Sequence, residues 1–208
     1  MLTVGIDNAN EDNMRLLHLS DLHICKTVND FPMIEDQAYM LRQVLEMIER
    51  ESVDALLLAG DIYDKPVPSE EAVRLLDSFL CSLAEKGTET FLISGNHDSD
   101  ERLHFGSSLF EKNNIHIAAK YDGSIYRRSC QDEYGAVNIY MLPFVKASQV
   151  KHFYPGEKIA SYDDAVRVAL SHAQLSPKES NILVAHQFVV GESEEPQPGG
   201  SESAAVLH

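Results

Sequence analysis

The sequence predicts an α/β fold in which helices cover a largely buried β-sheet. Short apolar runs alternate with longer stretches whose apolar residues recur at helical spacing, which is the pattern of a β-α-β-α-β unit. Polar motifs follow these runs directly, at the strand ends where open α/β sheets gather their ligands. With 208 residues and 44% of them hydrophobic, the chain suits one domain with a sizeable core.

Three strands are predicted in the first half of the chain. Residues 15–19 (RLLHL) and 54–59 (DALLLA) are short apolar runs, and a third strand is expected over 90–94 (TFLIS). Continuous apolar runs of this length are typical of strands that are buried on both faces. We expect His18, within the first strand, to be packed or hydrogen-bonded.

Two helices are predicted between these strands. Apolar residues recur at helical spacing over 33–51. Ser69, followed by two glutamates, has the pattern of an N-cap with an acidic first turn, and Gly87 has the pattern of the helix end. The inward face of the second helix is expected to carry Val73, Leu76, Phe79, Leu80 and Leu83.

The second half of the chain is less regular. Strands are predicted over 115–118, 124–128, 136–142 and 181–185, and a helix that begins with a Ser161 cap is predicted to end near residue 172.

The domain is expected to span residues 14–190. Residues 1–13 form an N-terminal extension in this interpretation, and 191–208 form a mobile acidic loop or tail that is rich in Gly, Pro and Ser.

Composition narrows the classes of function. The formal net charge of −16, without a basic stretch, argues against non-specific nucleic-acid binding through the surface alone. Three scattered cysteines indicate reduced thiols rather than a disulfide framework. No signal peptide and no apolar run near the roughly 20 residues of a membrane span are present, so we expect a cytoplasmic protein without a membrane partner.

Polar motifs with metal-ligand chemistry follow four predicted strands. They are SDLH with Asp21 and His23, GDIYD with Asp61 and Asp64, GNHD with Asn96, His97 and Asp98, and AHQ with His186. Carboxylate, imidazole and amide oxygen together suit Mn²⁺, Fe or Zn²⁺. Two cations about 3.5–4 Å apart need a carboxylate between them.

Asp61 is the natural candidate for that bridge because it follows the middle strand. Glycines before Asp61 and Asn96 let the backbone come close to ions or phosphate. Each motif alone has a structural interpretation, as a cap, a turn or a strand-end histidine. Their recurrence at successive strand ends favours a metal site.

These motifs resemble the calcineurin-like metallophosphoesterases. The set D-x-H, G-D-x-x-D, G-N-H-D and a later single His, together with LLHLSDLHI, ALLLAGDIYDKPVPS and FLISGNHDS, is similar to the SbcD-type DNA repair nucleases of that superfamily. The resemblance covers residues 14 to about 190 and implies a β-sandwich flanked by helices.

The resemblance also implies a role for each matching residue. Asp21 and His23 would bind a first metal, Asn96 and His186 a second, and Asp61 both. His97 would donate a proton to the departing 3′-oxygen. We expect Asp98 to orient the His97 ring. Asp64 and His104 are candidates for contacts with substrate or for support of the ligands, and a surface position is the alternative for His104.

The implied function is that of a DNA exonuclease and endonuclease. The cofactors would be two Mn²⁺ ions, and the partners DNA, a Rad50-like ATPase of the SbcC type and a second copy of the chain. The family's Gly-His-x-His motif is missing, and His208 has no partner histidine beside it. We therefore expect an N-terminal fragment, truncated before its last strands, with an incomplete metal site and impaired activity. Two alternatives stay open: a small-substrate phosphoesterase of the same superfamily, and a non-catalytic folded module.

Overall fold

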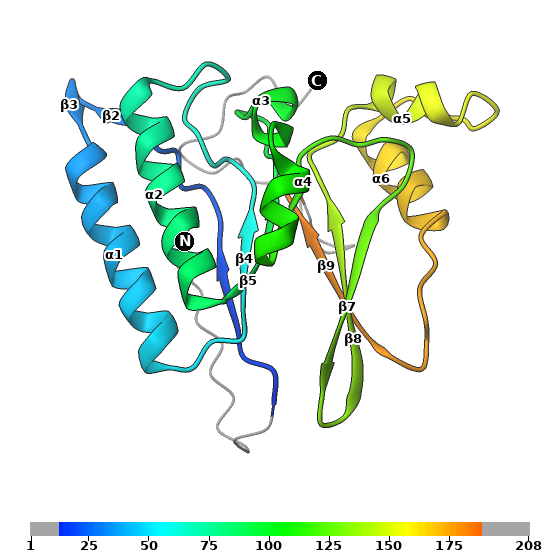
Figure 1. Cartoon of the computed structure of the whole chain (residues 1–208). Coiled ribbons are helices and arrows are strands. Elements are labelled where there is room, and N and C mark those ends of the chain that lie inside the picture. Colours follow the sequence, from blue (N-terminus) through cyan, green and yellow to red (C-terminus); the bar gives the residue numbers. More distant parts are fainter. Residues whose placement is uncertain (1–12, 189–208) are drawn as a thin grey trace.

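Two β-sheets pack face to face between two layers of helices in the computed structural model, which describes residues 13–188 (Figure 1). The layers follow the order helix, sheet, sheet, helix, and each interface is apolar. The predicted α/β class and the sandwich flanked by helices are confirmed. No helix among residues 13–188 is long and apolar enough to cross a membrane.

The first sheet is parallel and has the strand order β1-β4-β5-β6. Its strands are β1 (Leu16–Leu19), β4 (Ala55–Ala59), β5 (Glu89–Ile93) and β6 (Ile115–Ala118). β4 lies between β1 and β5, so Asp61 does follow a middle strand. His18 is exposed on the edge strand β1, and the expectation that it is packed there is wrong.

Helices α1 (Ile34–Arg50) and α2 (Glu70–Lys86) cover the outer face of this sheet (Figure 1). Ser69 caps α2 as predicted, because its hydroxyl accepts a hydrogen bond from the Ala72 N–H, and Gly87 ends the helix in the left-handed conformation. Val73 is 46% exposed, so its predicted inward position is wrong. The other four residues predicted on that face are buried.

The second sheet has the order β7-β8-β9, from β7 (Tyr126–Asp132), β8 (Gly135–Leu142) and β9 (Ser180–Ala185). β9 runs parallel to β8. Helices α5 (Ala147–Phe153) and α6 (Tyr162–Ser171) cover its outer face (Figure 1). Between the sheets, Phe91 and Ile93 of the first pack with Ile139 and Met141 of the second.

Short elements that were not predicted connect the longer ones. They are the hairpin of β2 (Thr27–Val28) and β3 (Phe31–Pro32), the helices α3 (Asp100–His104) and α4 (Ser107–Phe110), and a 3₁₀ turn (Glu111–Asn113). Helix α5 was not predicted either. The expected tail at 191–208 and all of the expected N-terminal extension except Asn13 lie outside the described residues.

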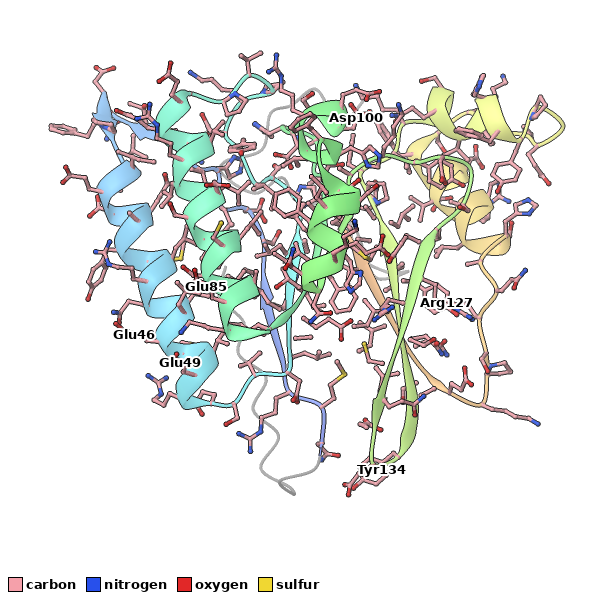
Figure 2. All side chains as sticks on the ribbon, viewed as in Figure 1. Glu46, Glu49, Glu85, Asp100, Arg127 and Tyr134 are labelled. Carbon is pink, nitrogen blue, oxygen red and sulfur yellow. The ribbon has the colours of Figure 1, made fainter. Side chains whose placement is uncertain are left out.

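The outer face of the α1–α2 layer is acidic. Glu46 and Glu49 project from α1, and Glu85 projects from α2 (Figure 2). All three side chains are exposed. Glu49 is paired with Lys86 of α2, so part of this negative charge is offset, and the remaining charge disfavours contact of a polyanionic substrate with this face.

Candidate metal centre

The predicted metal ligands gather at one edge of the sandwich. Asp21 and His23 follow β1, Asp61 follows β4, and His97 follows β5, so the parallel strands deliver them to the same edge. His186 arrives from the second sheet, directly after β9. These residues form two triads, Asp21–Asp61–His186 and His23–Asp61–His97. Within each triad, the donor atoms lie within 4.8 Å of one another.

Asp61 is the centre of this cluster and belongs to both triads. Its Oδ2 lies 3.4 Å from Nε2 of His186, 3.6 Å from Nε2 of His23 and 4.0 Å from Nε2 of His97. Its Oδ1 accepts the backbone N–H of His97 at 2.9 Å. The residue is only 3% exposed. One buried carboxylate therefore faces three imidazoles, as a carboxylate shared between two cations would.

The three imidazoles present the same nitrogen to the cluster. Nδ1 of His186 lies 2.7 Å from the Ala59 carbonyl oxygen, and Nδ1 of His97 lies 3.1 Å from the Asp64 carbonyl oxygen. A ring that donates its Nδ1–H to a carbonyl keeps the lone pair of Nε2 free for a cation.

His23 is the third ring, and its Nδ1 is buried without a hydrogen-bond partner. Oδ1 of Asp64 lies 3.5 Å from it. Asp64 therefore contacts His97 through its carbonyl group and lies beside His23 through its carboxylate, which supports the role of a residue that orients ligands. A contact of Asp64 with substrate stays a prediction.

Electrostatics at the cluster suit cation ligands. Burial raises the pKa of Asp61, but the hydrogen bonds from His186 and from the His97 backbone outweigh it and leave the pKa lowered. Burial lowers the pKa of His23. Burial lowers the pKa of His186, but the Asp61 carboxylate and the Ala59 carbonyl raise it by more and leave it above the ordinary value. A charged carboxylate among imidazoles is a donor set that Mn²⁺, Fe or Zn²⁺ accepts, so the residues fit the implied metals.

Asp98 has a different position from the one predicted. Its carboxylate accepts three backbone N–H groups, from Ile62 at 3.0 Å, Tyr63 at 2.9 Å and Gly95 at 2.9 Å. The expectation that Asp98 orients the His97 ring is wrong, because these amides occupy the carboxylate and the ring contacts the Asp64 carbonyl instead. Asp98 ties the loop after β4 to the loop after β5.

The backbone at the ligands is unusual. Asp21, His23 and Asp61 adopt φ values of 58°, 42° and 50°, in the left-handed region that residues with a side chain rarely occupy. Such conformations cluster at functional sites, where the surrounding structure holds them. Gly95 lies close against Asp61, since a Cβ atom there would lie 2.1 Å from Oδ1 of Asp61. The predicted approach of this backbone to ions or phosphate stays a prediction.

Two predicted site residues stand apart from the cluster. Asn96 follows β5 but is exposed, and among residues 13–188 no hydrogen bond joins its side chain to the triads. His104 is exposed on the short helix α3. Their predicted roles as a metal ligand and a substrate contact stay predictions. So does the division of ligands between two metals, because the triads pair Asp21 with His186 and His23 with His97.

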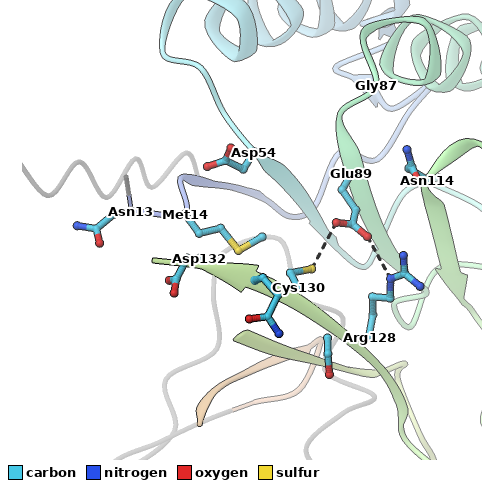
Figure 3. Close-up of a pocket in the computed structure, with 11 residues that line it drawn as sticks. Asn13, Met14, Asp54, Gly87, Glu89, Asn114, Arg128, Cys130 and Asp132 are labelled. Carbon is cyan, nitrogen blue, oxygen red and sulfur yellow. Dashed lines mark hydrogen bonds and ion pairs between the residues drawn. The ribbon is translucent and has the colours of Figure 1, made fainter. Parts of the chain in front are cut away.

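A second polar region lies at the opposite ends of the same strands (Figure 3). A cavity of about 530 Å³ is lined there by residues that precede β4, β5 and β6 and by residues of β7. Its central carboxylate, Glu89, is already paired with His116, Arg128 and Cys130. This network joins the two sheets, and it is separate from the metal ligands.

Comparisons with known proteins agree with the geometry. The family described as calcineurin-like phosphoesterase matches residues 14–200. A curated protein of Staphylococcus epidermidis, the D component of the nuclease SbcCD, is 32% identical over 204 residues, which cover 94% of this chain and 53% of that protein. The chain thus spans about half the length of this relative.

One solved structure, of Yfce, a phosphoesterase from E. coli, covers 62% of this chain and 57% of its own, with 15% identity and a TM-score of 0.32. This likeness is too loose to carry an argument.

Proposed function

The chain belongs to the calcineurin-like phosphoesterases, and from this membership we propose that it is a metal-dependent DNA phosphodiesterase, the nuclease part of an SbcD-type protein. The observation that carries the proposal is the convergence of three strand ends of one sheet and one of the other on Asp61. The relative from S. epidermidis is named as a component of a nuclease, which favours DNA as the substrate.

Two divalent cations, with Mn²⁺ as the first candidate, would be held by strand-end residues around the shared Asp61. The ligands we propose are Asp21, His23, Asp61, Asn96 and His186. Bound cations would lower the pKa of a water molecule, so that it could act as hydroxide at neutral pH. They would also offset the negative charge that grows on the phosphoryl oxygens.

We propose that His97 is not a metal ligand and instead carries on Nε2, in the doubly protonated ring, the proton for the departing 3′-oxygen. Its side chain is 32% exposed, so a substrate can reach it. The Asp64 carbonyl holds one edge of the ring through Nδ1, and the backbone N–H of His97 donates to Asp61. The ring is thus held at the rim of the cluster before any substrate arrives.

The partners and the location of the chain are further parts of the proposal. We propose an SbcC-type ATPase and a second copy of the chain as partners, and the cytoplasm as the compartment. The relative's name supports the SbcC partner, and the three cysteines, all free, fit a reducing compartment.

One observation favours a small-substrate phosphoesterase as the second candidate. The net charge of −16 and the acidic α1–α2 face oppose the approach of a DNA duplex but not of a small ester (Figure 2).

Hydrolysis assays with Mn²⁺ test the proposal. The substrates are bis-p-nitrophenyl phosphate, a phosphate monoester and an end-labelled DNA duplex, and the variants are Asp61→Asn and Asp77→Asn. Asp77 is exposed on α2 and serves as the matched control. We expect wild type and Asp77→Asn to cleave DNA slowly, in keeping with the impaired activity that the sequence predicts. Asp61→Asn should lose at least about 100-fold of that rate, because loss of a metal ligand costs more than the roughly 10- to 100-fold lost with a residue that only supports a ligand.

Each alternative has its own outcome in these assays. Turnover of the monoester without cleavage of DNA would identify the small-substrate enzyme. No turnover by a folded wild-type protein would identify the non-catalytic module.

A further inference from the structure

Gln37, near the start of α1, holds the loop that carries His23. Its side-chain amide makes three hydrogen bonds to the backbone of that loop. Nε2 donates to the carbonyl oxygens of Leu22 at 2.9 Å and His23 at 2.8 Å, and Oε1 accepts the N–H of Cys25 at 2.8 Å. No sequence pattern indicates this contact, because a glutamine in a helix has no motif around it.

The loop needs such support because its backbone is strained. His23 and Cys25 have φ values of 42° and 71°, in the left-handed region. On the other side, the loop is held by the segment after β4, since the N–H groups of His23 and Ile24 donate to the carbonyls of Asp61 and Ile62. Gln37 closes the opposite side of the loop.

The chemistry of the three bonds is specific to a carboxamide. Two carbonyl oxygens need N–H donors and one backbone N–H needs an acceptor, and a glutamine side chain offers both at the same length. The helix fixes the base of this side chain, because the Gln37 N–H donates to the Met33 carbonyl oxygen. A glutamate of the same size would place an oxygen against the two carbonyl oxygens.

We propose that Gln37 is a positioning residue for the metal centre, which sets the place of the His23 imidazole and thereby the affinity for the cation. This inference rests on the proposed function, because it takes His23 as a ligand. The Nδ1 atom of His23 has no hydrogen-bond partner of its own. The position of the ring therefore depends on the backbone that Gln37 holds, together with the Asp64 carboxylate 3.5 Å from Nδ1.

Substitutions of the same shape test the inference. Gln37→Met removes all three hydrogen bonds, and Gln37→Glu keeps the acceptor for Cys25 but removes the donors. Gln43 on the same helix is the matched control, since it is exposed and, among residues 13–188, its side chain bonds only to Glu46. The measurements are Mn²⁺ titration by calorimetry, a thermal melt without metal, and amide hydrogen exchange of the metal-free protein.

We expect both Gln37 variants to bind Mn²⁺ about 10- to 100-fold more weakly than wild type, the usual effect of removing a residue that supports a ligand. The Cys25 amide should exchange faster in Gln37→Met and stay protected in Gln37→Glu. Gln43→Met and Gln43→Glu should match wild type in both measurements.

Three results would overturn the inference. The first is wild-type Mn²⁺ affinity in the folded Gln37 variants. The second is a lowered melting temperature with unchanged affinity, which would make Gln37 an attachment point for α1 alone. The third is unfolding of both Gln37 variants beside folded Gln43 variants. A wild-type protein that binds no Mn²⁺ would instead contradict the proposed function.

Discussion

Asp61 is the residue on which the metal centre depends. Both of its oxygens are engaged, Oδ2 by the three imidazoles and Oδ1 by the backbone N–H of His97. It keeps this place only because Gly95 has no side chain, since the Cβ of any other residue would lie 2.1 Å from Oδ1 and 2.3 Å from the Asp61 nitrogen. The backbone of Asp61 cannot give way easily, because β4 and Asp98 hold the chain on both sides of it.

Gly95→Ala should therefore displace Asp61 and weaken Mn²⁺ binding by at least about 10-fold, as loss of ligand geometry does. Gly156→Ala is the control, because a Cβ there would meet nothing within 4 Å and its φ is not in the left-handed region. Calorimetric titration of both variants checks this. Equal affinity in the two variants would show that Asp61 is not confined as the structure indicates.

The chemistry of the individual residues could be predicted, but their hydrogen-bond partners could not. The motifs identified every carboxylate and imidazole of the two triads. The partners that orient the rings are the carbonyls of Ala59 and Asp64, and every residue carries a carbonyl, so no sequence pattern marks them. Backbone amides are equally unmarked in the sequence. The sequence therefore suggests the neighbouring His97 as the partner of Asp98, whereas Asp98 bonds to amides of two loops.

Strand β5 carries a polar network at each end. Its carboxyl end leads into the metal ligands, and its amino end begins with Glu89, whose Oε1 lies 3.0 Å from Nε2 of His116 and 3.2 Å from Nε of Arg128 (Figure 3). The Cys130 thiol donates to Oε2. The hydrogen bond with His116 lowers the pKa of Glu89 more than burial raises it, and the bonds to Cys130 and Arg128 add to this effect.

Because its pKa is lowered on folding, charged Glu89 stabilises the fold above the pKa of an unfolded glutamate. That stability is lost as the pH falls through the lower folded value. Glu89→Gln should cost about 1.5–3 kcal/mol of unfolding free energy at about pH 7, the usual range for hydrogen bonds to a charged group. Urea denaturation should show this difference shrinking toward about pH 3. A difference that is constant over that range would show that Glu89 does not carry charge-dependent stability.

Helices and strands that are long enough to repeat their apolar spacing could be predicted, and very short ones could not. Helices α1 and α2 each span 17 residues, so their apolar spacing repeats, and α2 also carries a serine cap at its start and a glycine at its end. Helix α4 has four residues and strands β2 and β3 have two each, too few for any period. The exposed Val73 shows that helical spacing also gives the inward face only approximately.

At the scale of the whole molecule, the site exists because the two sheets face each other. Nδ1 of His186 contacts the carbonyl of Ala59, 127 residues earlier in the chain, and this contact joins the second sheet to the carboxyl end of β4. A Cβ on Gly60 would meet the His186 ring at 2.5 Å, so the two sheets also fit closely here. Sequence spacing cannot bring β9 to this edge. The strand-end position placed His186 among the candidate motifs, and the family resemblance added its role as a metal ligand.

The measurement that tests the metal centre most directly is anomalous diffraction from a crystal of the chain soaked in Mn²⁺. We expect anomalous density beside Oδ2 of Asp61, within coordination distance of at least one imidazole Nε2. The proposal that these strand ends form a metal centre would be contradicted if a crystal soaked to saturation showed no manganese at Asp61. Manganese bound only elsewhere on the surface would contradict it equally.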